Sequence, residues 1–172
     1  VARLVGAKPS EVVFTSGARN LVTGDSNQAN DILRLDLNTG SFVRVNASSS
    51  GVQGDTHADH AQITPDGRYV VFESRATNLV AVPGDSTLFT KIFVKDLERG
   101  TLTPLTTEGA GETSPAWSPD GKRLAYMPRR SAASAVKVRA LDGSAPELEL
   151  PAPKDSGAEP KSWTRDGRAI VV

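Results

Sequence analysis

The sequence predicts an all-β protein built from repeated four-stranded antiparallel sheets, and three observations support this fold class. A nine-residue string recurs, as TPDGRYVVF at 64–72, SPDGKRLAY at 118–126 and TRDGRAIVV at 164–172. Apolar and polar residues alternate with a period of two, as in strands with one buried face. Gly, Pro, Asn and Asp interrupt each run before a helical stripe could develop.

The recurring string is predicted to be a β-hairpin. An Asp-Gly pair between two apolar runs is a strong hairpin signal, because glycine adopts the positive φ that closes the turn. The aspartate is expected to accept hydrogen bonds from backbone N–H groups about two residues further on. The residues expected to form these hairpin turns are Asp66, Gly67, Asp120, Gly121, Asp166 and Gly167.

A second pair of strands follows in each unit. The segments are DILRLDLNTGSFVRV at 31–45, KIFVKDLERGTLTPL at 91–105 and VKVRALDGSAPEL at 136–148, and each breaks at a glycine turn. Each unit therefore holds four strands. A twisted four-stranded sheet that repeats about every 50 residues is typical of a β-propeller blade.

We expect about three and a half blades in a single β-propeller, at approximately 1–54, 55–108 and 109–156, with a partial blade at 157–172. Propellers typically use about four to eight blades. The ring is therefore expected to be closed by a further segment of a longer chain, which the initial valine favours, or by homo-oligomerisation through unpaired edges.

The segment PAWSPDGK at 115–122, with the apolar strand and the DLERG type of turn, resembles the PD40 (WD40-like) repeat of TolB-like β-propellers. The resemblance extends over nearly the whole chain. The first unit lacks the Asp-Gly signature, and the third has Leu-Asp-Gly in place of Asp-Leu-x-x-Gly. The resemblance implies a non-catalytic module that binds a protein partner, in the bacterial periplasm or outside the cell.

Two other functions stay open. Similar propellers form the substrate-gating domain of prolyl-oligopeptidase-like serine peptidases. A carbohydrate-active propeller of the lyase type would instead place a histidine and aspartate site in its channel. The sequence has no nucleophile elbow, zinc-binding motif or phosphate-binding glycine loop, so we do not expect enzymatic activity from this chain.

Composition argues against several kinds of partner. Twenty basic residues balance twenty acidic ones, which disfavours nucleic-acid binding. The absence of cysteine removes disulfides and thiolate metal sites. No apolar run approaches the roughly 18 residues that would cross a bilayer, so membrane insertion is not expected.

The segment GDTHADHAQ at 54–62 is the first candidate site, because it holds both histidines of the chain. On an extended strand Asp55, His57 and Asp59 would share one face, as a small ligand, a partner or a divalent metal requires. The resemblance places the segment near the mouth of the central channel. A solvated loop between blades is the alternative. The candidate binding residues are Asp55, His57, Asp59 and His60.

A second, weaker candidate lies in GDSNQAND at 24–31. Asp25, Asn27 and Asp31 supply oxygen ligands at a spacing similar to that of calcium loops, but the central glycine and terminal glutamate of an EF-hand are absent. The alternative is a turn rich in Asn and Asp, and no other cofactor is expected. Trp117 and Trp163 are expected to pack in the core between neighbouring blades.

Overall fold

The computed structural model describes residues 10–81, 89–106, 111–129, 135–151 and 159–172. Within these residues every regular element is a strand, which confirms the predicted all-β fold. No helix in the described ranges is long and apolar enough to cross a membrane. The strands are β1 (Glu11–Ser16), β2 (Asp31–Asp36), β3 (Phe42–Arg44), β4 (Ala58–Ile63), β5 (Tyr69–Ser74), β6 (Lys91–Asp96), β7 (Leu102–Pro104), β8 (Glu112–Trp117), β9 (Arg123–Pro128), β10 (Ala135–Ala140), β11 (Leu148–Pro151), β12 (Ser162–Trp163) and β13 (Ile170–Val171).

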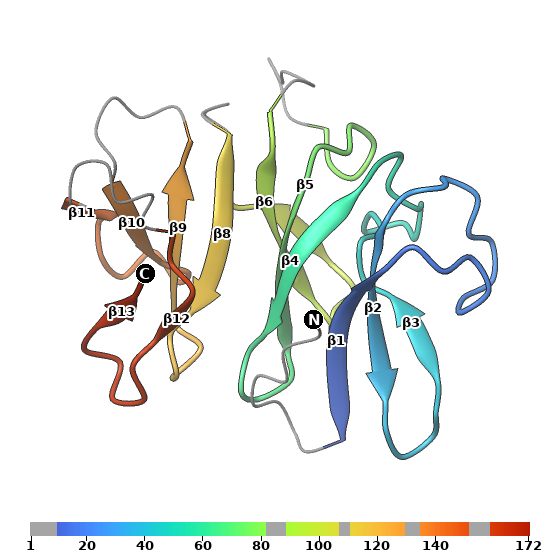
Figure 1. Cartoon of the computed structure of the whole chain (residues 1–172), viewed down its shortest axis with the longest axis horizontal. Coiled ribbons are helices and arrows are strands. Elements are labelled where there is room, and N and C mark those ends of the chain that lie inside the picture. Colours follow the sequence, from blue (N-terminus) through green and yellow to red (C-terminus); the bar gives the residue numbers. More distant parts are fainter. Residues whose placement is uncertain (1–9, 82–88, 107–110, 130–134, 152–158) are drawn as a thin grey trace.

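The strands form antiparallel sheets that follow one another along the chain. The sheets are β1-β2-β3, β4-β5-β6-β7, β8-β9-β10-β11 and the pair β12-β13. They lie side by side in Figure 1, with β4 next to β1 on one side and to β8 on the other. The predicted β-propeller of four-stranded blades is therefore confirmed. The first strand expected in the first unit falls in residues 1–9, outside the described residues.

The three Asp-Gly hairpin turns share one set of hydrogen bonds. In the first turn, Thr64 Oγ1 donates to Asp66 Oδ1 at 2.6 Å and accepts from the backbone N of Tyr69 at 2.9 Å. Gly67 takes a φ of 76°. Ser118 with Asp120 and Thr164 with Asp166 repeat the bond from hydroxyl to carboxylate. This bond is the main reason why the pKa values of Asp66, Asp120 and Asp166 are lowered.

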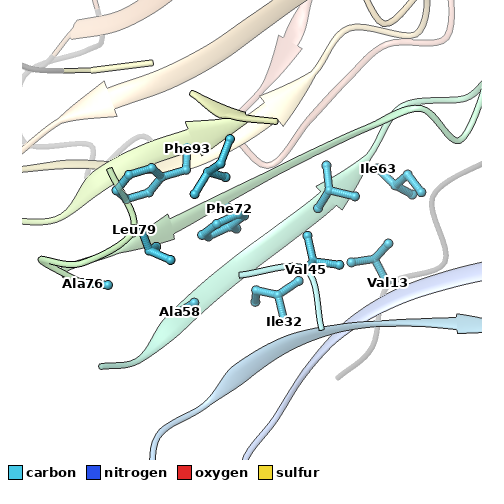
Figure 2. Packing of buried hydrophobic residues seen from close by; sticks show 11 residues of the cluster. Val13, Ile32, Val45, Ala58, Ile63, Phe72, Ala76, Leu79 and Phe93 are labelled. Atoms are coloured by element: carbon cyan, nitrogen blue, oxygen red, sulfur yellow. The ribbon is translucent and has the colours of Figure 1, made fainter. Parts of the chain in front are cut away.

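Apolar side chains hold the sheets together. Figure 2 shows the layer between the first two sheets, where Val13, Ile32 and Val45 meet Ala58, Ile63, Phe72 and Phe93. Phe72 and Phe93 are buried and stack with ring centroids 5.6 Å apart. Stacked aromatic pairs of this kind contribute about 0.5–1.5 kcal/mol beyond the area they bury.

Each tryptophan links one sheet to the next. Trp117 packs between the second and third sheets, and its Nε1 donates to the Gln62 carbonyl oxygen at 3.3 Å. Trp163 packs on the far face of the third sheet and donates to the Ala116 carbonyl oxygen at 2.9 Å. The same residue type thus supplies apolar area and one hydrogen bond at two successive interfaces between sheets.

Candidate functional site

A cavity of about 610 Å³ opens where the inner strands of successive sheets converge. Its walls are residues 13–15 of β1, 59–62 of β4, 114–115 of β8 and the segment 159–161 that leads into β12. β4 and β8 lie near the middle of the molecule in Figure 1. The volume falls within the range of about 300–1,000 Å³ that is usual for ligand pockets. We call this space the central cavity.

Both inner strands are distorted where they face the central cavity. The pairing of β4 with β5 shifts within residues 59–62, and that of β8 with β9 shifts within 113–116. His60 and Ser114 take positive φ values of 54° and 56°, which costs a residue with a side chain of the order of 1–3 kcal/mol. β-Bulges are frequent beside binding sites, where they redirect side chains. Two successive blades therefore present the same strained backbone to one cavity.

His60, at the wall of the central cavity, pairs with Glu73 of β5. His60 Nδ1 lies 2.7 Å from Glu73 Oε1, and Glu73 Oε2 accepts a hydrogen bond from the Ser114 N–H at 3.1 Å. The Glu73 side chain is 12% exposed, whereas that of His60 is 62% exposed. The bond to Glu73 is the main cause of the raised pKa of His60. One carboxylate thus connects an imidazole of the second sheet to the backbone of the third.

Asp55 and His57 precede β4, which begins at Ala58, and neither lines the central cavity. The Asp55 carboxylate accepts hydrogen bonds from the N–H and the hydroxyl of Thr77, at 3.0 and 2.5 Å. His57 Nδ1 accepts from the Asn30 N–H at 2.9 Å. The extended strand that would align residues 55, 57 and 59 therefore does not reach residue 55. Of the four candidate binding residues, Asp59 and His60 line the central cavity.

The residues of the second candidate gather around Arg44. Arg44 Nε donates to Asp31 Oδ2 at 2.8 Å, and its guanidinium lies 3.9 Å from Asp25 Oδ1. Asn27 Nδ2 donates to the other Asp31 oxygen at 3.2 Å, as does Asn46 Nδ2 at 2.8 Å. The guanidinium of Arg44 thus supplies positive charge among the oxygen atoms that were candidates for binding calcium. Across the described ranges, no three His, Cys, Asp or Glu side chains converge as metal ligands would.

A smaller cavity of about 310 Å³ adjoins the central cavity, since Asp59 lines both. Arg75, directly after β5, and Arg129, directly after β9, also line it, together with His57 and Glu73. We call it the arginine cavity. Neither arginine is among the candidates predicted from the sequence, although each stands at the same distance from the Asp-Gly turn of its own unit. That shared position was the signal that could have found them.

No family model matches the chain. Among curated proteins, dipeptidyl-peptidase 5 of Trichophyton equinum is 29% identical in an alignment 125 residues long, and the match covers 64% of this chain and 17% of that protein. The dipeptidyl-peptidase 5 of Arthroderma otae matches to the same extent. The chain therefore spans only 17% of the length of these curated relatives.

Solved structures share the fold over most of the chain. TolB from Acinetobacter baumannii superposes with a TM-score of 0.62 at 22% identity, over 94% of this chain and 34% of TolB. The β-propeller domain of the Trilobed protease from Pyrococcus furiosus gives a TM-score of 0.57 at 16% identity, over 90% of this chain and 44% of that domain. The expected likeness to TolB is thus confirmed in the fold, and the chain is a β-propeller of the kind that occurs in TolB and in this protease.

Proposed function

We propose that this chain is a non-catalytic binding propeller that holds an extended segment of another polypeptide in its central cavity. The observation that carries the proposal is the cavity itself, which inner strands of successive blades build together. Propellers commonly place their binding surfaces around the central channel, but the fold alone does not identify a ligand. The chemistry of the cavity wall supplies the further argument.

The wall offers what an extended polypeptide needs. Phe14 and Pro115 provide apolar surface, and Asp59, His60 and Glu159 provide polar and charged groups. An extended peptide presents apolar and polar side chains alternately, with amide groups between them. A mixed wall along a channel fits such a ligand better than a uniformly apolar pocket would.

A steric block tests the proposal. Thr15 is an exposed residue of β1 that lines the central cavity, so Thr15→Trp should fill part of the cavity without disturbing the core. Thr103 is the matched control, because it is an exposed threonine of β7 that lines a different pocket. The probe is a fluorescein-labelled pool of randomised octapeptides, followed by fluorescence anisotropy. We expect Thr15→Trp to weaken binding about tenfold or more, and Thr103→Trp to leave it unchanged; equal binding by both variants would reject the central cavity as the site.

The sequence match to dipeptidyl-peptidase 5 favours a second candidate. In this alternative the chain belongs to a larger serine peptidase, and its propeller controls the access of peptide substrates. The complete protein from which the chain comes would then release dipeptides from a chromogenic dipeptidyl substrate, and Thr15→Trp would raise the KM for long peptides more than for the dipeptidyl substrate. A complete protein without hydrolase activity would exclude this candidate.

Two further expectations belong to the proposal. A periplasmic or secreted location rests on the resemblance to TolB-like propellers, and fractionation of the native host would test it. The carbohydrate-lyase hypothesis required histidine and carboxylate ligands in one place. Among the described residues no three His, Cys, Asp or Glu side chains are arranged to hold a metal ion, so no observation favours this hypothesis over the two candidates above.

A further inference from the structure

Arg75 and Arg129 occupy equivalent positions in neighbouring blades and line the same arginine cavity. Arg75 Nε makes a long contact of 3.5 Å to the hydroxyl of Thr90. Within the described residues, neither guanidinium lies within ion-pair distance of a carboxylate. Two positive charges at one cavity therefore have no acidic partner of their own in the part of the chain that the structure describes.

The acidic groups at the arginine cavity are already hydrogen-bonded elsewhere. Asp59 Oδ1 accepts from Asn30 Nδ2 at 3.3 Å. The two Glu73 oxygens bond to the His60 ring and to the Ser114 N–H. Neither of these carboxylates pairs with either arginine, so an incoming anion would meet attraction from two guanidiniums and repulsion from two acids.

The shape of the guanidinium groups and the kind of ligand proposed for the central cavity favour a carboxylate. A guanidinium binds a carboxylate through two parallel hydrogen bonds. A phosphate with two negative charges would meet about twice the repulsion from Asp59 and Glu73 and about twice the attraction from the two arginines, so charge alone does not choose between the two anions. A polypeptide, the ligand proposed for the central cavity, carries carboxylates as a matter of course. His57 uses Nδ1 to accept the Asn30 N–H, so its ring can add only Nε2–H as a further donor.

We propose that Arg75 and Arg129 bind a carboxylate of the polypeptide whose body lies in the central cavity. This inference rests on the proposed function, and it adds the chemical group that anchors the ligand. The two cavities adjoin at Asp59, so one extended chain can reach both. The carboxylate comes from the C-terminus of the ligand or from an Asp or Glu side chain, and the test separates the two sources.

The test compares three pools of randomised octapeptides by fluorescence anisotropy, each labelled at the N-terminus with a fluorophore that carries no carboxylate. The first pool lacks Asp and Glu and ends in a free carboxylate, the second is the same pool with a C-terminal amide, and the third is amidated but carries one Glu. We expect the amide without Glu to bind about tenfold or more weakly than a pool that carries a carboxylate, because a charged hydrogen-bonding partner is lost. Tight binding of the first pool identifies the C-terminus as the source, and tight binding of the third identifies a side chain.

Charge-removing variants locate the contact. Arg75→Gln and Arg129→Gln should each abolish the preference for the carboxylate pool, whereas Arg165→Gln should keep it. Arg165 is the matched control, because it is an exposed arginine of the last Asp-Gly turn, away from the arginine cavity. All three replaced residues are exposed, and matching circular dichroism spectra would verify that each variant folds.

The outcomes distinguish this inference from the proposed function. Equal binding of all three pools would overturn the inference and leave the proposed function standing, whereas failure of every pool to bind would overturn both. A carboxylate preference that survives in Arg75→Gln and Arg129→Gln would also overturn the inference. Stronger competition by inorganic phosphate than by acetate would reject a carboxylate as the ligand group.

Discussion

Gly121 offers a direct test of how neighbouring blades fit together. It takes a φ of 68° in the second Asp-Gly turn, and a Cβ added there would lie 3.3 Å from Thr64 Cγ2 of the preceding blade. Alanine at positive φ costs about 1–2 kcal/mol. The close contact adds about 1–2 kcal/mol of overpacking, because two hydrogen bonds fix the hydroxyl of Thr64 and it cannot easily move away.

Gly100 is the matched control for Gly121. Its φ is 69°, and a Cβ there would meet nothing within 4 Å. We therefore expect Gly100→Ala to lower the free energy of unfolding by about 1–2 kcal/mol and Gly121→Ala by about 2–4 kcal/mol, measured by urea denaturation of the two variants. Equal losses would refute the contact between the turn and the preceding blade. No loss in either variant would refute the left-handed turns themselves.

Three further predictions concern other contacts. Trp117→Phe should lower the free energy of unfolding by about 1–3 kcal/mol, because the Gln62 carbonyl loses the indole donor; urea denaturation would measure the loss, and wild-type stability would contradict it. The pair of His60 and Glu73 should stabilise the fold below pH 6.5, the ordinary pKa of histidine, and this gain should fade as the pH rises through the raised pKa of His60. Melting curves of wild type and His60→Gln should therefore differ most at the acidic end, and a constant difference across this range would reject the pair. Because Arg44 already compensates the acidic cluster, calcium chloride should leave the melting temperature unchanged, and a calcium-specific rise would establish the metal site instead.

Local patterns in the sequence were sufficient to predict the fold. The Asp-Gly turns depend on a few adjacent residues, and their repetition sets the length of each blade. The bulges at His60 and Ser114 could not be predicted in this way. Each places a residue with a side chain in the left-handed region. Histidine is enriched among such residues, but the conformation is still uncommon for it and serine shows no such enrichment, so neither residue type indicates a bulge by itself.

The candidate site was predicted only in part, because its members come from different blades. The segment 54–62 was recognised through its histidines. However, β4 begins only at Ala58, so Asp55 lies outside the strand that holds His60. Glu73 lies within β5, and Arg75 directly follows it. Nothing in the sequence of β5 marks these two charged residues as members of a site. Their significance comes from the packing of β5 beside β8, a contact between segments that are distant in the sequence.

Hydrogen–deuterium exchange with and without the bound octapeptide pool would test the central claim most directly. If the ligand lies in the central cavity, exchange should slow in residues 59–62 and 114–117, which line the cavity or continue its inner strands. Residues 103–105 and 139–143, which line a separate pocket of about 510 Å³ between the outer parts of the second and third sheets, should exchange as before. Protection confined to that second pocket would contradict the account and move the binding site away from the central cavity.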